Sequence, residues 1–324
     1  MVALSIMIEG QYGLTWPHWK QLVTEVEALG FAGLFRSDHF TNAQPPDLDS
    51  LETVVSLTYL ASHSEKLHFG PLVAPVSFRE PIMFARQAAA LDDLSNGRMI
   101  IGLGAGWQDR EHELFGFELG DMKTRMARFE EALEVVTRLL KSDEPVSFEG
   151  RFYQLRGATL LPRPQRPGGP SILIGGNGLK RTLSLAAKYA DIWNGTFLSP
   201  EGFKERSVAL DGFMVKAGRK PEDIQRTLMH TLVYARDNAD LAQKVQQMQS
   251  RQPELQGLSV DEAVARIQQT QAPGGGAVIG TPELLIKQIK AYAEVGVEEL
   301  MLQWFDLDDM AGLRSFATSV LPHL

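Results

Sequence analysis

The chain has 324 residues, of which 44% are hydrophobic and 22% are charged, and its net charge is −8. This composition is typical of a globular protein with a substantial core, and the acidic balance gives no basic face for nucleic acid or membranes. Cysteine is absent, which excludes disulfides, thiolate nucleophiles and cysteine-ligated metals. The seven histidines lack metal-binding spacing, and no apolar run approaches the ~18 residues of a membrane span. We therefore expect a cytoplasmic protein without a metal site.

In the first half of the chain, apolar runs alternate with amphipathic helical patterns. The start, MVALSIMIEG, lacks the basic region of a signal peptide and predicts a first strand over residues 3–8. Helix boundaries are indicated by Pro17 in a first turn, Gly30 as a stop and Ser50 as an N-cap. We predict further strands over 31–36, 67–75 and 99–104, and helices over 17–29, 50–61, 80–94 and 123–141.

The second half of the chain repeats this alternation, which predicts a parallel sheet. Eight strand–helix units in a chain of this length predict a (β/α)8 TIM barrel as a single domain over residues 1–324. A doubly wound sheet is the alternative, but the chain has no boundary near its middle. The predicted strands span 171–176, 191–195, 226–235 and 299–304, and the helices span 179–189, 203–218 and 279–296, before a short closing helix.

Two segments exceed what a barrel needs. Residues 146–170 are rich in Pro and Gly, with aromatic residues that fit a small hairpin. Residues 236–280 are Gln-rich, carry weak helical patterns and contain the sequence PGGG at 273–276, a predicted hinge. Because this second insertion follows a strand, we expect it at the C-terminal face as a lid, with an inert surface insertion as the alternative.

Polar residues stand where the predicted strands end, which is the catalytic end of a barrel. The second strand ends in Ser37, Asp38 and His39, and the first ends in Glu9. His39 predicts a general acid or base, although a hydrogen-bonded strand-end histidine is the usual fate of a lone His. Arg110 follows the fourth strand and either faces the site or opens a helix.

Two glycine-rich segments also follow strands. GLGAGW carries glycines at 102, 104 and 106, a spacing that disfavours a dinucleotide fingerprint but leaves backbone against which a flat ring can lie. IGGNGLKRT begins a helix with Lys180 and Arg181 in the first turn, where cations oppose the helix dipole. This segment predicts a phosphate site, with a tight turn and two solvated cations as the alternative.

Nearly the whole chain resembles the luciferase-like flavin-dependent oxidoreductases, and most closely the branch that uses the deazaflavin coenzyme F420. The resemblance implies a TIM barrel, usually a homodimer, with the cofactor ring at the C-terminal mouth. It is weakest over residues 243–273. The matching segments are IEGQYGLTW, GLFRSDHF, LVAPVSFREP, DLSNGRMIIGLGAGWQDREHELFGF, PSILIGGNGLKRTLSLAAKYADIWNG and IGTPELLIKQIKAYAEVGVEELMLQ.

The resemblance also implies roles for individual residues. Asp38 and His39 match the pair beside the ring, with His39 catalytic and Asp38 orienting it. Trp107 replaces a Glu of the F420-dependent sugar-phosphate dehydrogenases, which argues against their substrate here. The implied cofactor contacts are Asp38 beside the ring, Pro71 and Leu72 at a non-prolyl cis peptide, Ala74 where Thr is frequent, Ala105 and Gly106 near the ring, and Asn177, Gly178, Lys180 and Arg181 at the phosphate. From their places after predicted strands, Arg110 and Gly176 are expected as further cofactor contacts.

These features predict an oxidoreductase that transfers hydride between F420 and a small organic substrate. His39 is the expected catalytic residue, with Glu9 as a second candidate. Trp107 and Trp304 are the expected substrate contacts and suggest an apolar or planar guest. An FMN-dependent monooxygenase that uses reduced flavin and O2 is the alternative enzyme. A non-catalytic flavin-binding protein is the alternative from another class.

Overall fold

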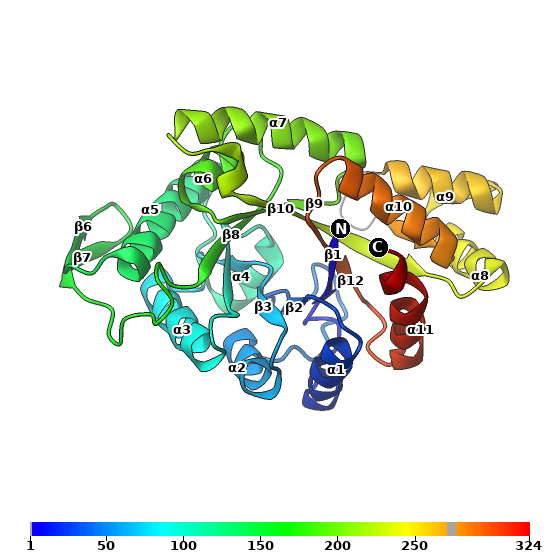
Figure 1. The fold of residues 1–324 in the computed structure, drawn as a ribbon, viewed down its shortest axis with the longest axis horizontal. Helices are drawn as coiled ribbons and strands as arrows, with labels where there is room; N and C mark the ends of the chain where they lie inside the picture. The colour runs from blue at the N-terminus through cyan, green and yellow to red at the C-terminus, as the bar shows by residue number, and fades with distance from the viewer. Residues whose placement is uncertain (1, 271–276) are drawn as a thin grey trace.

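The structure, a computed structural model, describes residues 2–270 and 277–324. Its parallel strands form a closed barrel that a ring of helices surrounds (Figure 1), which confirms the predicted (β/α)8 fold. The barrel closes where β4 pairs with β5 and Phe69 forms a bridge with Met99. In spatial order the barrel strands are β3 (His68–Pro71), β2 (Gly33–Arg36), β1 (Ala3–Ile8), β12 (Glu299–Gln303), β10 (Gln225–Tyr234), β9 (Ile192–Thr196), β8 (Ser171–Gly175), β5 (Ile100–Gly104) and β4 (Ala74–Pro75).

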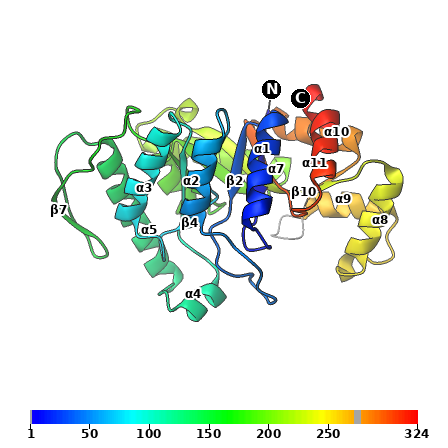
Figure 2. The same cartoon turned by 90° about the horizontal axis from the view of Figure 1, so that it is seen from below.

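The outer layer consists of helices whose apolar faces pack on the barrel. Most come where a parallel strand needs a crossover to the next. α4 lies apart from this ring, at one end of the barrel (Figure 2). The helices are α1 (Trp16–Ala28), α2 (Thr53–His63), α3 (Pro81–Leu94), α4 (Asp109–Phe115), α5 (Met122–Lys141), α6 (Thr182–Tyr189), α7 (Pro200–Lys216), α10 (Pro282–Glu294) and α11 (Met310–Val320), with short 3-10 turns η1 (Pro221–Asp223) and η3 (Leu321–His323).

Three predicted boundaries were wrong for identifiable reasons. Glu52, and not Ser50, caps α2 by accepting from the Val55 amide at 2.7 Å, while the Ser50 hydroxyl donates to the His39 carbonyl. The helix expected from residue 179 begins at Thr182, so the two cations before it stay in the turn. The predicted strand over 67–75 is interrupted between β3 and β4.

The first insertion forms a two-stranded antiparallel hairpin, β6 (Val146–Glu149) with β7 (Gln154–Ala158), as predicted. Val146 and Leu155 of the hairpin pack with Val135 and Leu139 of α5 in a small core of their own. The hairpin therefore extends the outer layer on the side of the barrel opposite to α8 (Asn238–Gln249) and α9 (Val260–Gln269) (Figure 2).

The second insertion is folded over its described residues. It contains α8 (Asn238–Gln249), η2 (Pro253–Leu255) and α9 (Val260–Gln269), and β11 (Val278–Gly280) pairs in parallel with β10. Leu241, Val245, Leu255 and Ile267 join residues of β11 in a separate apolar cluster. The predicted PGGG hinge at 273–276 lies outside the described residues. Across the described ranges, no helix is long and apolar enough to cross a membrane.

His230 of β10 is a buried histidine in an apolar setting between barrel and helices. Its side chain is 1% exposed and packs against the rings of Phe197 and Tyr292. Its Nδ1 has no hydrogen-bond partner among the described residues. Burial lowers the pKa of His230 to about 4, because the charged imidazolium would lose its hydration.

We predict that His230 makes the fold sensitive to acid. As the pH falls from about 6.5 to about 4, the unfolded chain binds a proton at this residue and the folded chain does not, so stability decreases. Between pH 8 and pH 4.5, His230→Leu should lose about 2 kcal/mol less unfolding free energy than wild type, measured by urea denaturation. The exposed control His323→Leu should behave as wild type, and equal pH dependence in all three proteins would contradict the prediction.

Candidate functional site

A cavity of about 560 Å³ lies at the mouth of the barrel, where the strands end. Its floor is apolar, with Leu72, Val73, Phe197 and Met229, as suits a planar aromatic guest. Its rim carries side chains from β10 and β12 themselves and from the segments that follow β1, β2 and β5. These rim residues are Glu9, Gln11, Ser37, His39, Trp107, Glu111, Thr231 and Gln303.

The floor of this cavity depends on Val73 packing over glycines of two neighbouring strands. A Cβ atom at Gly104 would lie 2.6 Å from Val73 Cγ2, and one at Gly175 would lie 3.2 Å from Cγ1. At Gly102 a Cβ atom would lie 2.0 Å from the Pro71 carbonyl oxygen. The glycines at 102 and 104 therefore make room for protein atoms, and the expectation that they leave bare backbone for a ring was wrong.

The non-prolyl cis peptide joins Leu72 to Val73, one residue after the expected Pro71–Leu72 bond. Leu72 and Val73 both line the cavity, whereas Pro71 is the last residue of β3 and does not line it. Ala74 is fully buried and Ala105 is half-buried. Neither alanine is among the residues that line the cavity, while Gly106 is.

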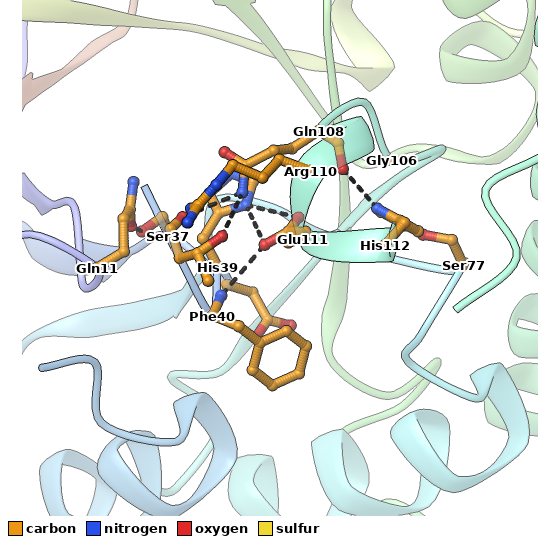
Figure 3. Close-up of polar contacts among 12 residues, drawn as sticks. Gln11, Ser37, His39, Phe40, Ser77, Gly106, Gln108, Arg110, Glu111 and His112 are labelled. Carbon is orange, nitrogen blue, oxygen red and sulfur yellow. Dashed lines mark hydrogen bonds and ion pairs between the residues drawn. The ribbon is translucent and has the colours of Figure 1, made fainter. Parts of the chain in front are cut away.

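His39 lies at the rim with its imidazole held by a carboxylate. Its Nδ1 is 2.9 Å from Glu111 Oε1 and 3.1 Å from Oε2 (Figure 3). Burial alone would lower the pKa of His39, but the hydrogen bond and charge of Glu111, with Glu9 and Asp38 nearby, outweigh it and raise that pKa above its ordinary value. The ring of Trp107, itself 60% exposed, meets the imidazole edge-on at 5.5 Å.

The family resemblance implied that Asp38 orients His39, but the structure does not show this contact. The two carboxylate oxygens of Asp38 accept from Nε and NH2 of Arg79 at 2.7 and 2.8 Å, and Arg79 also pairs with Glu52 at the start of α2. Asp38 is buried and does not line the cavity. Glu111 makes the contact with His39 instead. Nothing in the sequence distinguished Glu111, because an acidic residue in the first turn of a short helix is common.

Glu9 belongs to a hydrogen-bonded network along the opposite rim. Gln303 Nε2 donates to one of its carboxylate oxygens at 2.6 Å and Gln11 Nε2 donates to the other at 2.9 Å. The network continues from Gln11 to the hydroxyl of Ser37 and from Gln303 to the hydroxyl of Thr231. The carboxylate of Glu9 is thus fixed in the cavity wall, within the electrostatic reach of His39.

Arg110 lies outside the cavity, because its guanidinium is used by the loop after β2. It donates to the carbonyl of Asn42 at 2.8 Å and pairs with the carboxylate of Asp47 through both terminal nitrogens. Its expected role beside the cofactor is not supported by this placement, since the side chain points to the loop and not to the floor.

The glycine-rich turn after β8 is fastened to β9. Asn177 donates from Nδ2 to the carbonyl of Thr196 and accepts from the amide of the same residue, so its side chain is fully used. Gly176 lines the cavity with φ of 123°, and Gly178 has no space for a Cβ beside Thr182. Lys180 and Arg181 are exposed, and within the described chain their side chains form no hydrogen bond or ion pair.

Trp304 was expected in the substrate site but lies beside it. It is buried, and it lines a second hollow of about 800 Å³ between α8 and the segment after β12. Tyr12 and Phe305 line both hollows, with ring centroids 5.7 Å apart, and so form the wall between them. Within the described ranges, no group of three His, Cys, Asp or Glu side chains could hold a metal ion.

Comparisons with known proteins identify the class of enzyme to which this fold and site belong. The chain belongs to the luciferase-like monooxygenase family, whose model matches residues 6–299. It is 27% identical over 319 residues to an F420-dependent glucose-6-phosphate dehydrogenase of Amycolatopsis mediterranei (strain U-32), covering 94% of this chain and 93% of the relative. It is 25% identical over 319 residues to an FMNH(2)-dependent dimethylsulfone monooxygenase of Pseudomonas putida, covering 94% and 86%.

Solved structures share the same fold. An F420-dependent secondary alcohol dehydrogenase in complex with an F420–acetone adduct superposes with a TM-score of 0.82 at 19% identity, covering 99% of this chain and 98% of that one. A long-chain alkane monooxygenase superposes with a TM-score of 0.81 at 16% identity, covering 100% and 91%. The barrel fold is therefore shared with an F420-dependent dehydrogenase and with a monooxygenase.

We predict that Gly104→Ala damages the cavity floor. The new Cβ would force Val73 aside and should cost about 1–3 kcal/mol of unfolding free energy. Adding Val73→Ala should restore part of this loss, because it removes Cγ2, the methyl group in conflict with the new Cβ. Gly212→Ala is the control, since nothing lies within 4 Å of its Cβ position in α7, and it should stabilise slightly. Equal effects of Gly104→Ala in the two backgrounds would contradict the packing account.

Proposed function

We propose that this protein is an oxidoreductase that transfers hydride between F420 and a small organic substrate at the mouth of the barrel. The observation that carries the proposal is the arrangement of the mouth cavity, with the apolar floor of Leu72 and Val73 facing a single histidine that a buried carboxylate holds. The F420-dependent relatives over nearly the whole chain support the same conclusion.

The residues present fit a deazaflavin with a ribityl phosphate chain. Leu72 and Val73 offer an apolar surface of the kind that a tricyclic ring requires. Lys180 and Arg181 stand in a glycine-rich turn beside the cavity as charges without partners in the described chain, which suits a phosphate. When bound, F420 would supply a ring carbon that accepts or gives hydride.

His39 would manage the proton that accompanies the hydride. In the direction of substrate oxidation its neutral imidazole would accept a hydroxyl proton, and in the direction of reduction its imidazolium would donate one. The raised pKa of His39 keeps the imidazolium populated to a higher pH than for an ordinary histidine. Reduction should therefore persist at neutral pH and decline as the pH rises through this pKa, whereas oxidation should rise.

An FMN-dependent monooxygenase is the second candidate, because an FMNH(2)-dependent relative matches a similar share of the chain. A phosphate-binding turn would serve FMN as well as F420. The two candidate functions are therefore distinguished by which cofactor the protein binds. A flavin-binding protein without activity is less well supported, since it would have no use for a histidine held by Glu111 at the rim. Trp107, in place of the expected Glu, argues against a sugar phosphate as substrate.

We propose that the enzyme is a homodimer, as the family resemblance implies, and that it is cytoplasmic, as the absence of cysteine suggests. It would act on a small molecule without nucleic acid or membrane partners. The net charge of −8 supports the exclusion of nucleic acid, because phosphate backbones attract basic surfaces. Sedimentation of the purified protein would test the oligomeric state.

We predict that His39→Gln separates binding from turnover. The variant should bind F420 within about threefold of the wild-type Kd, because the floor and the phosphate turn are unchanged. Its kcat should fall by about 10²–10⁴-fold, since the proton partner is lost. F420 fluorescence and anaerobic turnover on a panel of secondary alcohols, aldehydes and enones measure the two quantities. His63→Gln, at an exposed position of α2, is the control, and full turnover in His39→Gln would rule out the assigned role.

We predict that the cations of the glycine-rich turn bind the cofactor phosphate. The double variant Lys180→Ala/Arg181→Ala should weaken F420 binding by about tenfold or more, as loss of charge-assisted hydrogen bonds implies. Binding of the phosphate-free ribityl deazaflavin should not change. Lys204→Ala on α7 removes an exposed charge elsewhere and should leave both affinities unaltered. An equal loss for the coenzyme and for the phosphate-free compound would mean that the turn had been distorted.

A further inference from the structure

The segment after β2, residues 39–50, carries His39 but has little regular structure and is largely exposed from residue 43 to 49. Side chains of α4 and the residue before it tie this segment down from the other side of the mouth (Figure 3). Gln108 donates to the Thr41 carbonyl, Arg110 binds Asp47, and Glu111 contacts His39. The position of the imidazole therefore depends on a helix 72 residues away in the chain.

Among these ties, only Glu111 combines a charge with nearly complete burial, at 1% exposure. One of its oxygens also accepts from the Phe40 amide at 3.2 Å, so the carboxylate is anchored to the backbone beside the imidazole. An ionised carboxylate can only accept hydrogen bonds, so the proton between the two groups belongs to Nδ1 of His39. The other ring nitrogen, Nε2, makes no hydrogen bond within the described residues.

We propose that Glu111 is a positioning residue that fixes the proton of His39 on Nδ1 and leaves Nε2 as the nitrogen that exchanges a proton in the cavity. Only the identity of the molecule with which Nε2 exchanges this proton rests on the proposed function. Glu111 itself touches neither substrate nor cofactor in this assignment. It performs the task that the sequence had assigned to Asp38, whose carboxylate is instead paired with Arg79.

The charges around the imidazole come from three segments. Glu111 approaches from α4, Glu9 from the segment after β1, and Asp38 from the end of β2. Asp38 is already paired with Arg79, and Glu9 is fixed by Gln303 and Gln11. Glu111 is the partner in direct contact, so removing its charge should lower the pKa of His39 more than changing either of the others.

The decisive variant is Glu111→Gln, which keeps the shape and removes the charge. A glutamine amide can donate to Nδ1, which a carboxylate cannot, so the variant should favour the neutral tautomer with its proton on Nε2. Ring-¹⁵N-labelled histidine NMR reads both the tautomer and the titration midpoint in the protein without substrate or cofactor. His39→Gln identifies the His39 signals among those of the seven histidines.

In wild type we expect neutral His39 to carry its proton on Nδ1 and to titrate above the ordinary midpoint of ~6.5. In Glu111→Gln the midpoint should fall by about one unit or more, and kcat should drop by about tenfold or more with the F420 Kd unchanged. Glu111→Asp keeps the charge and should retain the raised midpoint. Arg110→Gln is the matched control from the same helix: it loosens the segment at Asp47 and should leave the tautomer and midpoint as in wild type.

Two results would overturn the proposal. One is a wild-type His39 whose neutral form carries its proton on Nε2, which is measurable even if Glu111→Gln does not fold. The other is an equal change of the His39 tautomer and midpoint in Arg110→Gln and Glu111→Gln, which would mean that Glu111 only holds the segment in place. If the NMR results hold but F420 does not bind, the positioning role stands and the proposed function fails.

Discussion

The hydrogen bond between His39 and Glu111 joins the two halves of the mouth, and the geometry of the site depends on it. His39 follows β2 and Glu111 lies in α4 after β5, so the bond exists only because the barrel brings these strand ends together. A buried carboxylate without a partner would cost several kcal/mol. The pair therefore orders the segment after β2 and fixes the orientation of the His39 imidazole, the protonatable group at the cavity rim.

The other wall of the cavity follows from a steric constraint within the barrel. Val73 occupies space that side chains at Gly104 and Gly175 would otherwise fill, and this places an apolar surface beneath the mouth. The packing explains why glycines recur on two adjacent strands without serving as a dinucleotide fingerprint. The apolar floor, the charged rim and the glycine-rich turn, whose two cations have no partner among the described residues, are the features on which the proposed cofactor site rests.

Much of the fold could be predicted because the alternation of strands and helices is periodic and local. The barrel, its strand ends and the hairpin after α5 follow from patterns that neighbouring residues carry. The partner of His39 could not be predicted in this way, since Asp38 is adjacent in sequence whereas Glu111 is adjacent only in space. The same holds for Trp304, which directly follows β12 but faces a second hollow because α8 packs beside it.

The central claim is that this cavity takes a deazaflavin coenzyme, and one anaerobic titration tests it most directly. Purified protein is titrated with F420 and with FMN, in oxidised and reduced forms, and the Kd values are compared. The account predicts F420 binding at least about tenfold tighter than FMN, a difference of ~1.4 kcal/mol. Tighter binding of FMN, followed by oxygen-dependent turnover with reduced FMN alone, would contradict it.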